Sequence, residues 1–242
     1  MESKKKENKS SVINFYLIAY NLISGLGWMY VLFLTANTVL TWESKKDVLF
    51  SKNLYSETRI PLKVLLATAG LEVLNAAFRF VKSNPVVVFP QVFVRFLVIW
   101  AVADVFSVST QTIGLLLLNI CWSFSEIIRY FYYVSNLLNS DPYVLKWSRY
   151  NFFIILYPIG AIAETILIVN AALYLEPINI RKKYSFSLPN NLNISFDTYY
   201  FFWIWIVLYI PVFPLMYKHM LSQRRKYLYG KDLKKKFIKN QK

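Results

Sequence analysis

From Ser10 to Trp42 the sequence contains no charged residue. A helix needs about 20 mostly apolar residues to cross the hydrocarbon core of a bilayer, so this run is long enough to do so. It is also longer than the apolar part of a secretory signal peptide, and no cleavage site is evident in it. The run therefore predicts a membrane-spanning helix near the start of the chain.

Five more apolar segments follow the first one. They cover roughly residues 60–81, 85–105, 109–133, 150–175 and 198–217. Together the six segments predict an all-α membrane protein, built as one bundle of six transmembrane helices over residues 13–217. We expect a basic N-terminal tail over 1–12 and a basic cytosolic tail over 218–242, because lysine and arginine concentrate there.

The chain has a net charge of +15, and much of the excess lies in its two ends. Basic ends around an apolar body follow the positive-inside rule. With an even number of spans, both termini are then expected in the cytosol. The charge distribution favours membrane lipid as a partner and argues against nucleic acid.

The connection over 176–197 is expected on the opposite, luminal side. It contains the basic run 181–183, which goes against the charge rule, and the glycosylation sequon that begins at Asn193. Such a sequon is used only in a lumen, and many are left unmodified. The connection over 134–149 is expected on the cytosolic side.

Cysteine and histidine each occur once, as Cys121 and His219. One cysteine excludes an internal disulfide framework and a multi-cysteine metal site. One histidine beside the basic tail makes a Ser-His-Asp triad or a histidine-based metal site improbable. We therefore expect no metal and no cofactor.

Several ionisable residues lie inside or at the ends of the apolar segments. Such groups usually face the bundle interior, where they either mark a functional site or hold helices together. For Lys63, Arg79 and Asp104 the structural interpretation is favoured. Glu126 and Arg129 are three residues apart and can pair on one helix face, as a structural pair or as part of a site.

Glu164 is different because it is the only charge in the segment 150–175. At 100° per residue, Tyr157, Gly160, Ala161 and Glu164 share one face of a helix, with the outer Cα atoms about 10 Å apart. Two polar side chains then flank two small residues, which leaves room for a substrate. The same small residues also suit a helix-packing notch, so spacing alone leaves both interpretations open.

Several long stretches, in order from about residue 15 to 228, resemble the 3-hydroxyacyl-CoA dehydratase family of very-long-chain fatty-acid elongation. Its members are also called protein-tyrosine-phosphatase-like proteins. The resemblance covers nearly the whole chain and is carried by LEVLNAAFRFV (71–81), QVFVRFLVIWAV (91–102), WSFSEIIRYFYYVSNLL (122–138), LKWSRYNFFIILYPIGAIAE (145–164), YSFSLPN (184–190) and YIPVFPLMYKHMLSQRRK (209–226).

The resemblance implies a multi-pass enzyme of the endoplasmic-reticulum membrane. It would remove water from a (3R)-3-hydroxyacyl-CoA to give a trans-2-enoyl-CoA, the third step of each elongation cycle. The family's catalytic tyrosine and glutamate match Tyr157 and Glu164. Its substrate-binding positions match four further residues, which are Arg95, Arg129, Arg149 and Gly160. Contact with other enzymes of the elongation cycle would be expected.

One part of the family pattern is missing. The phosphatase-like stretch His-Cys-x-x-Gly-x-x-Pro aligns here with residues 75–82, which contain no cysteine. Without that nucleophile, phosphatase chemistry is excluded at this position. Cys121 is no substitute, because the sixth residue after it is Ile127 and not an arginine.

Dehydration needs a base for the proton on carbon 2 and an acid for the departing hydroxyl. We expect Glu164 as the base and Tyr157 as the acid, although the reverse assignment suits the residue types nearly as well. Pro158 is expected to start or kink the helix and to aim Tyr157 into the bundle. Arg129, Lys146 and Arg149 would lie near the cytosolic mouth and hold the phosphates of coenzyme A.

The acyl tail would run between helices, with Trp122 among the aromatic residues available to line its path. Two other classes of function predict different features. A non-catalytic scaffold or acyl-CoA-binding member of the elongation complex would be expected to lack the tyrosine or the glutamate, and both are present. A small transporter would be expected to show internal repeats, and none is evident.

Overall fold

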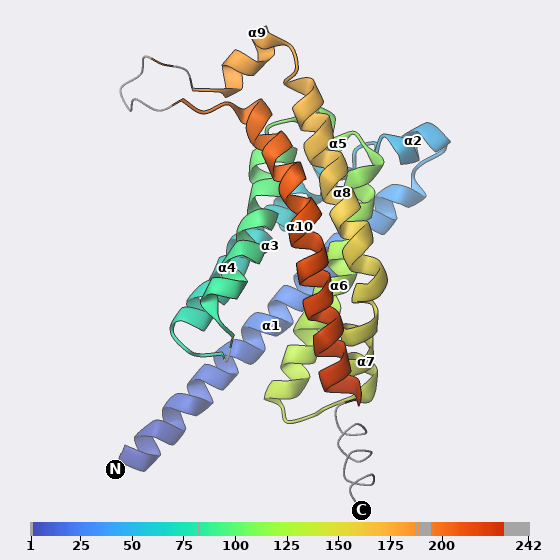
Figure 1. Cartoon of the computed structure of the whole chain (residues 1–242). Coiled ribbons are helices and arrows are strands. Elements are labelled where there is room, and N and C mark those ends of the chain that lie inside the picture. Colours follow the sequence, from blue (N-terminus) through green and yellow to red (C-terminus); the bar gives the residue numbers. More distant parts are fainter. Residues whose placement is uncertain (1, 82, 187, 189–194, 230–242) are drawn as a thin grey trace, which may run out of the picture.

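The computed structural model describes residues 2–81, 83–186, 188 and 195–229, and this part of the chain is helical (Figure 1). Its only strand-like pairing is a single bridge between Phe186 and Phe196. The prediction of an all-α protein is therefore confirmed. The sequon at Asn193 and the end of the basic tail lie outside the described residues.

Five helices are long and apolar enough to cross a membrane, counted over the described residues. They are α1 (Glu2–Leu40), α3 (Leu54–Ala77), α6 (Ile113–Leu137), α8 (Phe153–Tyr174) and α10 (Thr198–Arg224). These helices agree with five of the six apolar segments expected from the sequence. They define the chain as a helical membrane protein.

The remaining apolar segment forms a shorter element. Helix α4 (Pro85–Leu97) continues into a π-helical stretch, η1 (Val98–Ala103). Its apolar portion, 88–103, falls below the length of the five long helices. The element ends at Ala103, two residues before the expected end of the segment 85–105, and the Asp104 carboxylate that follows it binds cations on α3.

The long helices lie side by side around α6 (Figure 1). Helix α6 packs against α1 and α8, α3 packs against α1 and α4, and α10 covers α8. At Gly114 of α6 the helices approach closely, since a Cβ atom there would come within 2.6 Å of Leu167 on α8. Such close contact between helices needs a residue without a side chain.

Short helices occupy the ends of the bundle. Helices α2 (Lys45–Leu49), α5 (Ser107–Thr110) and α9 (Ile178–Arg181), followed by the 3-10 turn η2 (Lys182–Tyr184), lie at the upper end in Figure 1. The start of α1, the α3–α4 connection, α7 (Tyr143–Asn151) and the end of α10 lie at the lower end. A π-helical turn, η3 (Arg225–Tyr229), follows α10.

Helix α7 forms inside the region that was expected to be a simple connection, 134–149. Pro142 occupies its N-cap position, and the helix carries apolar residues on one side and polar residues on the other. This pattern suits a helix that lies at the end of a bundle. It brings Arg149 against the end of α6.

Pro158 lies inside α8, which begins at Phe153 and not at the proline. Proline has no N–H, so the carbonyl of Ile154, four residues earlier, loses its helical partner. The Tyr217 hydroxyl of α10 donates a hydrogen bond to that carbonyl at 3.4 Å. The missing bond in α8 is thus replaced by a contact with α10.

The basic run in the 176–197 connection has a local explanation. The Arg181 guanidinium lies over the Tyr199 ring, 4.3 Å from its centre, and 3.7 Å from a carboxylate oxygen of Asp197. Both partners belong to the start of α10. At least one charge of this run therefore attaches the connection to the bundle.

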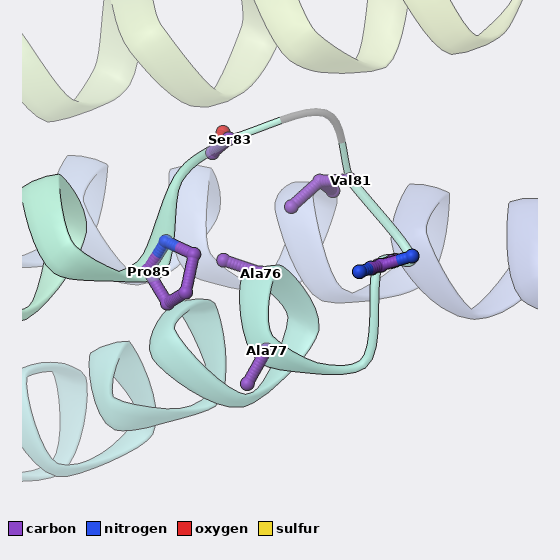
Figure 2. Close-up of a pocket in the computed structure, with 6 residues that line it drawn as sticks. Ala76, Ala77, Val81, Ser83 and Pro85 are labelled. Carbon is purple, nitrogen blue, oxygen red and sulfur yellow. The ribbon is translucent and has the colours of Figure 1, made fainter.

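The α3–α4 connection borders an open hollow of about 460 Å³, lined by Ala76, Ala77, Arg79, Val81, Ser83 and Pro85 (Figure 2). Arg79 adopts a left-handed backbone conformation with φ of 58°, as part of the turn that follows α3. The hollow coincides with the segment that aligns with the phosphatase-like stretch of the family. Its walls offer no nucleophilic thiol.

Candidate active site

Tyr157 and Glu164 both lie on α8, and both are partly buried. The intervening Gly160 is buried against α6, where a Cβ atom added to it would lie 3.7 Å from Cβ of Cys121. Glu164 also contacts α6, and it contacts α10 as well. This face of α8 is therefore turned into the bundle, as the spacing of the residues predicts.

The Glu164 carboxylate accepts hydrogen bonds from two other helices. The indole N–H of Trp122 on α6 lies 3.1 Å from Oε1. The hydroxyl of Tyr209 on α10 donates to Oε2. Each carboxylate oxygen thus has one donor, and each keeps further acceptor capacity.

Tyr157 lies in a stack of aromatic rings. Its ring centre is 5.1 Å from that of Phe213 and 6.3 Å from that of Tyr217, both on α10, with nearly parallel planes. Among the described residues, no hydrogen-bond partner of the Tyr157 hydroxyl is present. The phenol is thus fixed by its ring, and its hydroxyl is left available.

A buried chain of charges runs beside this pair. Glu126 of α6 is 1% exposed and accepts hydrogen bonds from Arg95 on α4 and from Arg129 on its own helix. Arg129 also binds both carboxylate oxygens of Glu72 on α3, at 2.7 and 2.8 Å. The Tyr130 hydroxyl donates to the same carboxylate at 2.6 Å. The expected pairing of Glu126 with Arg129 is confirmed as part of a larger network.

The network reaches Glu164 through one side chain. The Arg95 guanidinium lies 5.3 Å from the centre of the Trp122 ring, and the same indole donates to Glu164. A cation over an aromatic face is a stabilising contact. The structure therefore brings Arg95 to the candidate site. Arg129 is connected to Arg95 through Glu126, which both arginines bind.

Arg149 lies elsewhere, at the end of the bundle where α6 meets α7. Its guanidinium faces the rings of Tyr132, Tyr133 and Tyr150, and it donates a hydrogen bond to the Tyr133 hydroxyl at 3.1 Å. Within the described residues, no carboxylate lies within ion-pair distance of it. Lys146 on the same helix pairs instead with Asp141, at 2.7 Å.

The structural interpretation of Lys63 and Asp104 is supported by their contacts. The Asp104 carboxylate lies 2.7 Å from both the Lys63 ammonium and the Arg59 guanidinium, and Tyr55 donates to it at 3.3 Å. These groups join α3 to the end of η1. They are separate from the Tyr157–Glu164 pair.

Two residues at the candidate site were not expected there. The sequence did not single out Tyr209 as a site residue, because a tyrosine in an apolar segment has many ordinary roles. Trp122 was expected to line an acyl path, whereas its indole nitrogen binds Glu164. Both contacts depend on the relative rotation of neighbouring helices, which local spacing does not encode.

A carboxylate and a phenol on one helix face, in a largely apolar bundle, are suited to moving protons. Over the described part of the chain, no group of three or more histidine, cysteine, aspartate or glutamate side chains is positioned to hold a metal ion. Fold and site together define a helical membrane protein with a candidate acid–base pair between α6, α8 and α10.

Comparison with known proteins identifies the family. Residues 67–230 match the family described as "Protein tyrosine phosphatase-like protein, PTPLA", and the chain belongs to this family. Cys121 is buried in α6 against α8. No solved structure matches the chain.

Curated relatives cover most of the chain. A mouse protein named very-long-chain (3R)-3-hydroxyacyl-CoA dehydratase 2 is 37% identical over 234 residues, which cover 97% of this chain and 89% of the mouse protein. A Caenorhabditis elegans dehydratase of the same name, hpo-8, is 33% identical, with 92% and 99% coverage. The rice dehydratase PASTICCINO 2A is 33% identical, with 90% and 95% coverage.

Proposed function

We propose that this protein is a very-long-chain (3R)-3-hydroxyacyl-CoA dehydratase, which removes water to give a trans-2-enoyl-CoA during fatty-acid elongation. Relatives in mouse, worm and rice carry this name and align over nearly the whole chain. The observation that carries the proposal is the Tyr157–Glu164 pair, with the carboxylate held by donors from two helices and the phenol hydroxyl available.

The proposed reaction uses both groups in one elimination. The C2–H bond breaks and its proton passes to the Glu164 carboxylate, while the electron pair forms the C2=C3 double bond. The C3–O bond breaks, and the leaving hydroxyl takes the phenolic proton of Tyr157 and departs as water. Return of the proton from Glu164 to Tyr157 restores both groups. General acid–base steps of this kind contribute about 10²–10⁴-fold each.

The hydrogen bonds around Glu164 favour this assignment over the reverse. Trp122 and Tyr209 both donate to the carboxylate, and an ionised carboxylate is an acceptor only. Both hydrogen bonds stabilise the ionised carboxylate, which is the form that accepts a proton. The Tyr157 hydroxyl still carries a proton that it can donate.

We propose that Arg149 binds a phosphate of coenzyme A. The supporting observation is that this guanidinium has aromatic neighbours and no carboxylate at ion-pair distance in the described region. Arg95 and Arg129 already bind carboxylates. We therefore propose that they contribute to substrate binding indirectly, by fixing the helices that surround the site. Gly160 would let the thioester approach α8 closely.

We further propose that the protein resides in the endoplasmic-reticulum membrane, with six spans and both termini in the cytosol. The sixth span would be α4 with η1, and the tails would be 1–12 and 218–242 around the domain 13–217. The supporting arrangement is that the start of α1, helix α7 and the end of α10 lie at one end of the bundle (Figure 1). The charged coenzyme would enter from that end.

The activity is tested directly with the protein purified in detergent. It is supplied with (3R)- and (3S)-3-hydroxyacyl-CoAs of graded chain length, and enoyl-CoA is followed by mass spectrometry. We expect turnover of the 3R substrates. Tyr157→Phe and Glu164→Gln should each lower kcat by about 10²–10⁴-fold in a folded protein.

Two results would contradict the proposal. A folded wild-type protein without dehydratase activity would instead indicate a non-catalytic member of the elongation complex. Near-normal turnover by either variant would show that the pair is not the catalytic machinery. Binding of other elongation enzymes is examined separately, by co-purification from membranes.

A further inference from the structure

Tyr209 is the donor that α10 supplies to Glu164. Its hydroxyl binds Oε2 of the carboxylate, while Trp122 of α6 binds Oε1. Tyr209 is partly buried, so the contact is shielded from bulk water. A hydrogen bond to a charged group is worth more in such a site than at an exposed surface.

The two donors together fix the orientation of the carboxylate. A carboxylate bound through one oxygen is free to turn about its last bond. When α6 and α10 each bind a different oxygen, that rotation is blocked. The remaining lone pairs then point in a constant direction, toward which a C2–H bond must be presented.

A second tyrosine of α10 uses its hydroxyl for a contact with the backbone of α8. Tyr217 also donates to α8, but its acceptor is the backbone carbonyl of Ile154 at 3.4 Å. Both tyrosines therefore join the same two helices through their hydroxyls. Only Tyr209 acts on the ionisable side chain, and this difference provides a matched control.

We propose that Tyr209 is a positioning residue for the dehydration, which orients the Glu164 carboxylate for proton abstraction. This inference rests on the proposed function and concerns a residue to which neither the spacing on α8 nor the resemblance assigned a role. Removing the Tyr209 hydroxyl should lower kcat while KM changes little, because the substrate is still bound. A misdirected base typically costs about tenfold to a hundredfold in rate.

The experiment compares Tyr209→Phe with Tyr217→Phe in the detergent-purified full chain. For each variant, kcat and KM are measured for one (3R)-3-hydroxyacyl-CoA over a range of pH, and thermal unfolding is recorded. We expect Tyr209→Phe to lose at least about tenfold in kcat and to change the pH dependence of kcat. Tyr217→Phe keeps the ring that stacks on Tyr157 and loses only the hydroxyl bound to the Ile154 carbonyl, so it should keep the pH dependence and most of kcat.

A double-mutant cycle with Glu164→Asp separates positioning from general loss of structure. The shorter side chain withdraws the carboxylate from Tyr209, so Tyr209→Phe should cost much less in this background than in the wild type. Equal losses in both backgrounds would overturn the inference. The same holds if Tyr209→Phe and Tyr217→Phe behave alike in an active enzyme. An inactive wild type would instead refute the proposed function, and this inference with it.

Discussion

The indole nitrogen of Trp122 lies 3.1 Å from Oε1 of Glu164, and the same indole carries the Arg95 guanidinium 5.3 Å from its ring centre. One side chain of α6 thus touches both the candidate base and the buried chain of charges. The position of Glu164 is therefore coupled to the packing of α4 against α6.

Trp122→Phe should lower kcat by about tenfold, because Glu164 loses one of its two donors and Arg95 loses its preferred ring. Trp203→Phe is the matched control, since the Trp203 indole nitrogen is buried and has no hydrogen-bond partner within the described chain. Initial rates of the two variants give the comparison. Equal kcat values would show that the indole N–H has no role in the reaction.

Glu126→Gln should destabilise the protein by about 3–5 kcal/mol, because Arg95 and Arg129 would keep their buried charges without this partner. Asp141→Asn removes a carboxylate from the more exposed pair with Lys146 and should cost about 1 kcal/mol or less. Unfolding by SDS in mixed micelles measures both. Similar stabilities of the two variants would mean that the buried network does not hold the helices together.

The Gly160→Ala variant distinguishes an effect on helix packing, seen as a change in stability, from an effect on substrate contact, seen as a change in activity. A Cβ atom at this position lies 3.7 Å from Cβ of Cys121, an ordinary contact, so the fold should keep its stability within about 1 kcal/mol. If Gly160 borders the thioester, activity falls nonetheless. Gly114→Ala should behave in the opposite way, with a loss of about 1–3 kcal/mol, because its Cβ would lie 2.6 Å from Leu167. Thermal unfolding and turnover of both variants test this contrast.

The ion pair at the end of η1 should make stability depend on pH. A hydrogen bond from Lys63, together with the charge of Arg59, lowers the pKa of Asp104, which lies just beyond the apolar helix. A lowered pKa in the folded state stabilises the protein above the ordinary aspartate value of about 3.9, and this contribution disappears as pH falls through the lowered pKa. Wild type should therefore exceed Asp104→Asn in Tm near pH 7, with a difference that shrinks toward about pH 3. A constant difference would contradict the assignment.

Apolar length and helical periodicity are local properties, and they predict most of the fold. The five long helices fall on the expected segments because each needs only its own residues to be recognised as apolar. The segment near 85–105 ends at Ala103, and the next residue, Asp104, binds Lys63, 41 residues away, a contact that local apolarity does not encode. Helix α7 and the uninterrupted start of α8 at Phe153 were also not expected, since both depend on neighbouring helices.

In the candidate site, too, some features are local to one helix and others depend on neighbouring helices. Tyr157 and Glu164 are recognisable because both lie on one helix, and a lone charge in an apolar segment is conspicuous. Their surroundings come from helices distant in sequence, such as Tyr209, which is 45 residues from Glu164. The depth at which α10 crosses α8 decides that contact. Spacing along a single helix carries no information about it.

The chain of charges through Glu72, Arg129, Glu126 and Arg95 has a consequence for biogenesis. The ion pairs connect α3, α6 and α4, so α3 and α4 each carry a charge that is neutralised by a residue of α6. An isolated charge at the centre of a bilayer costs several kcal/mol. Since α6 follows α3 and α4 in the chain, these two charges gain their partners only after the central helix has been synthesised.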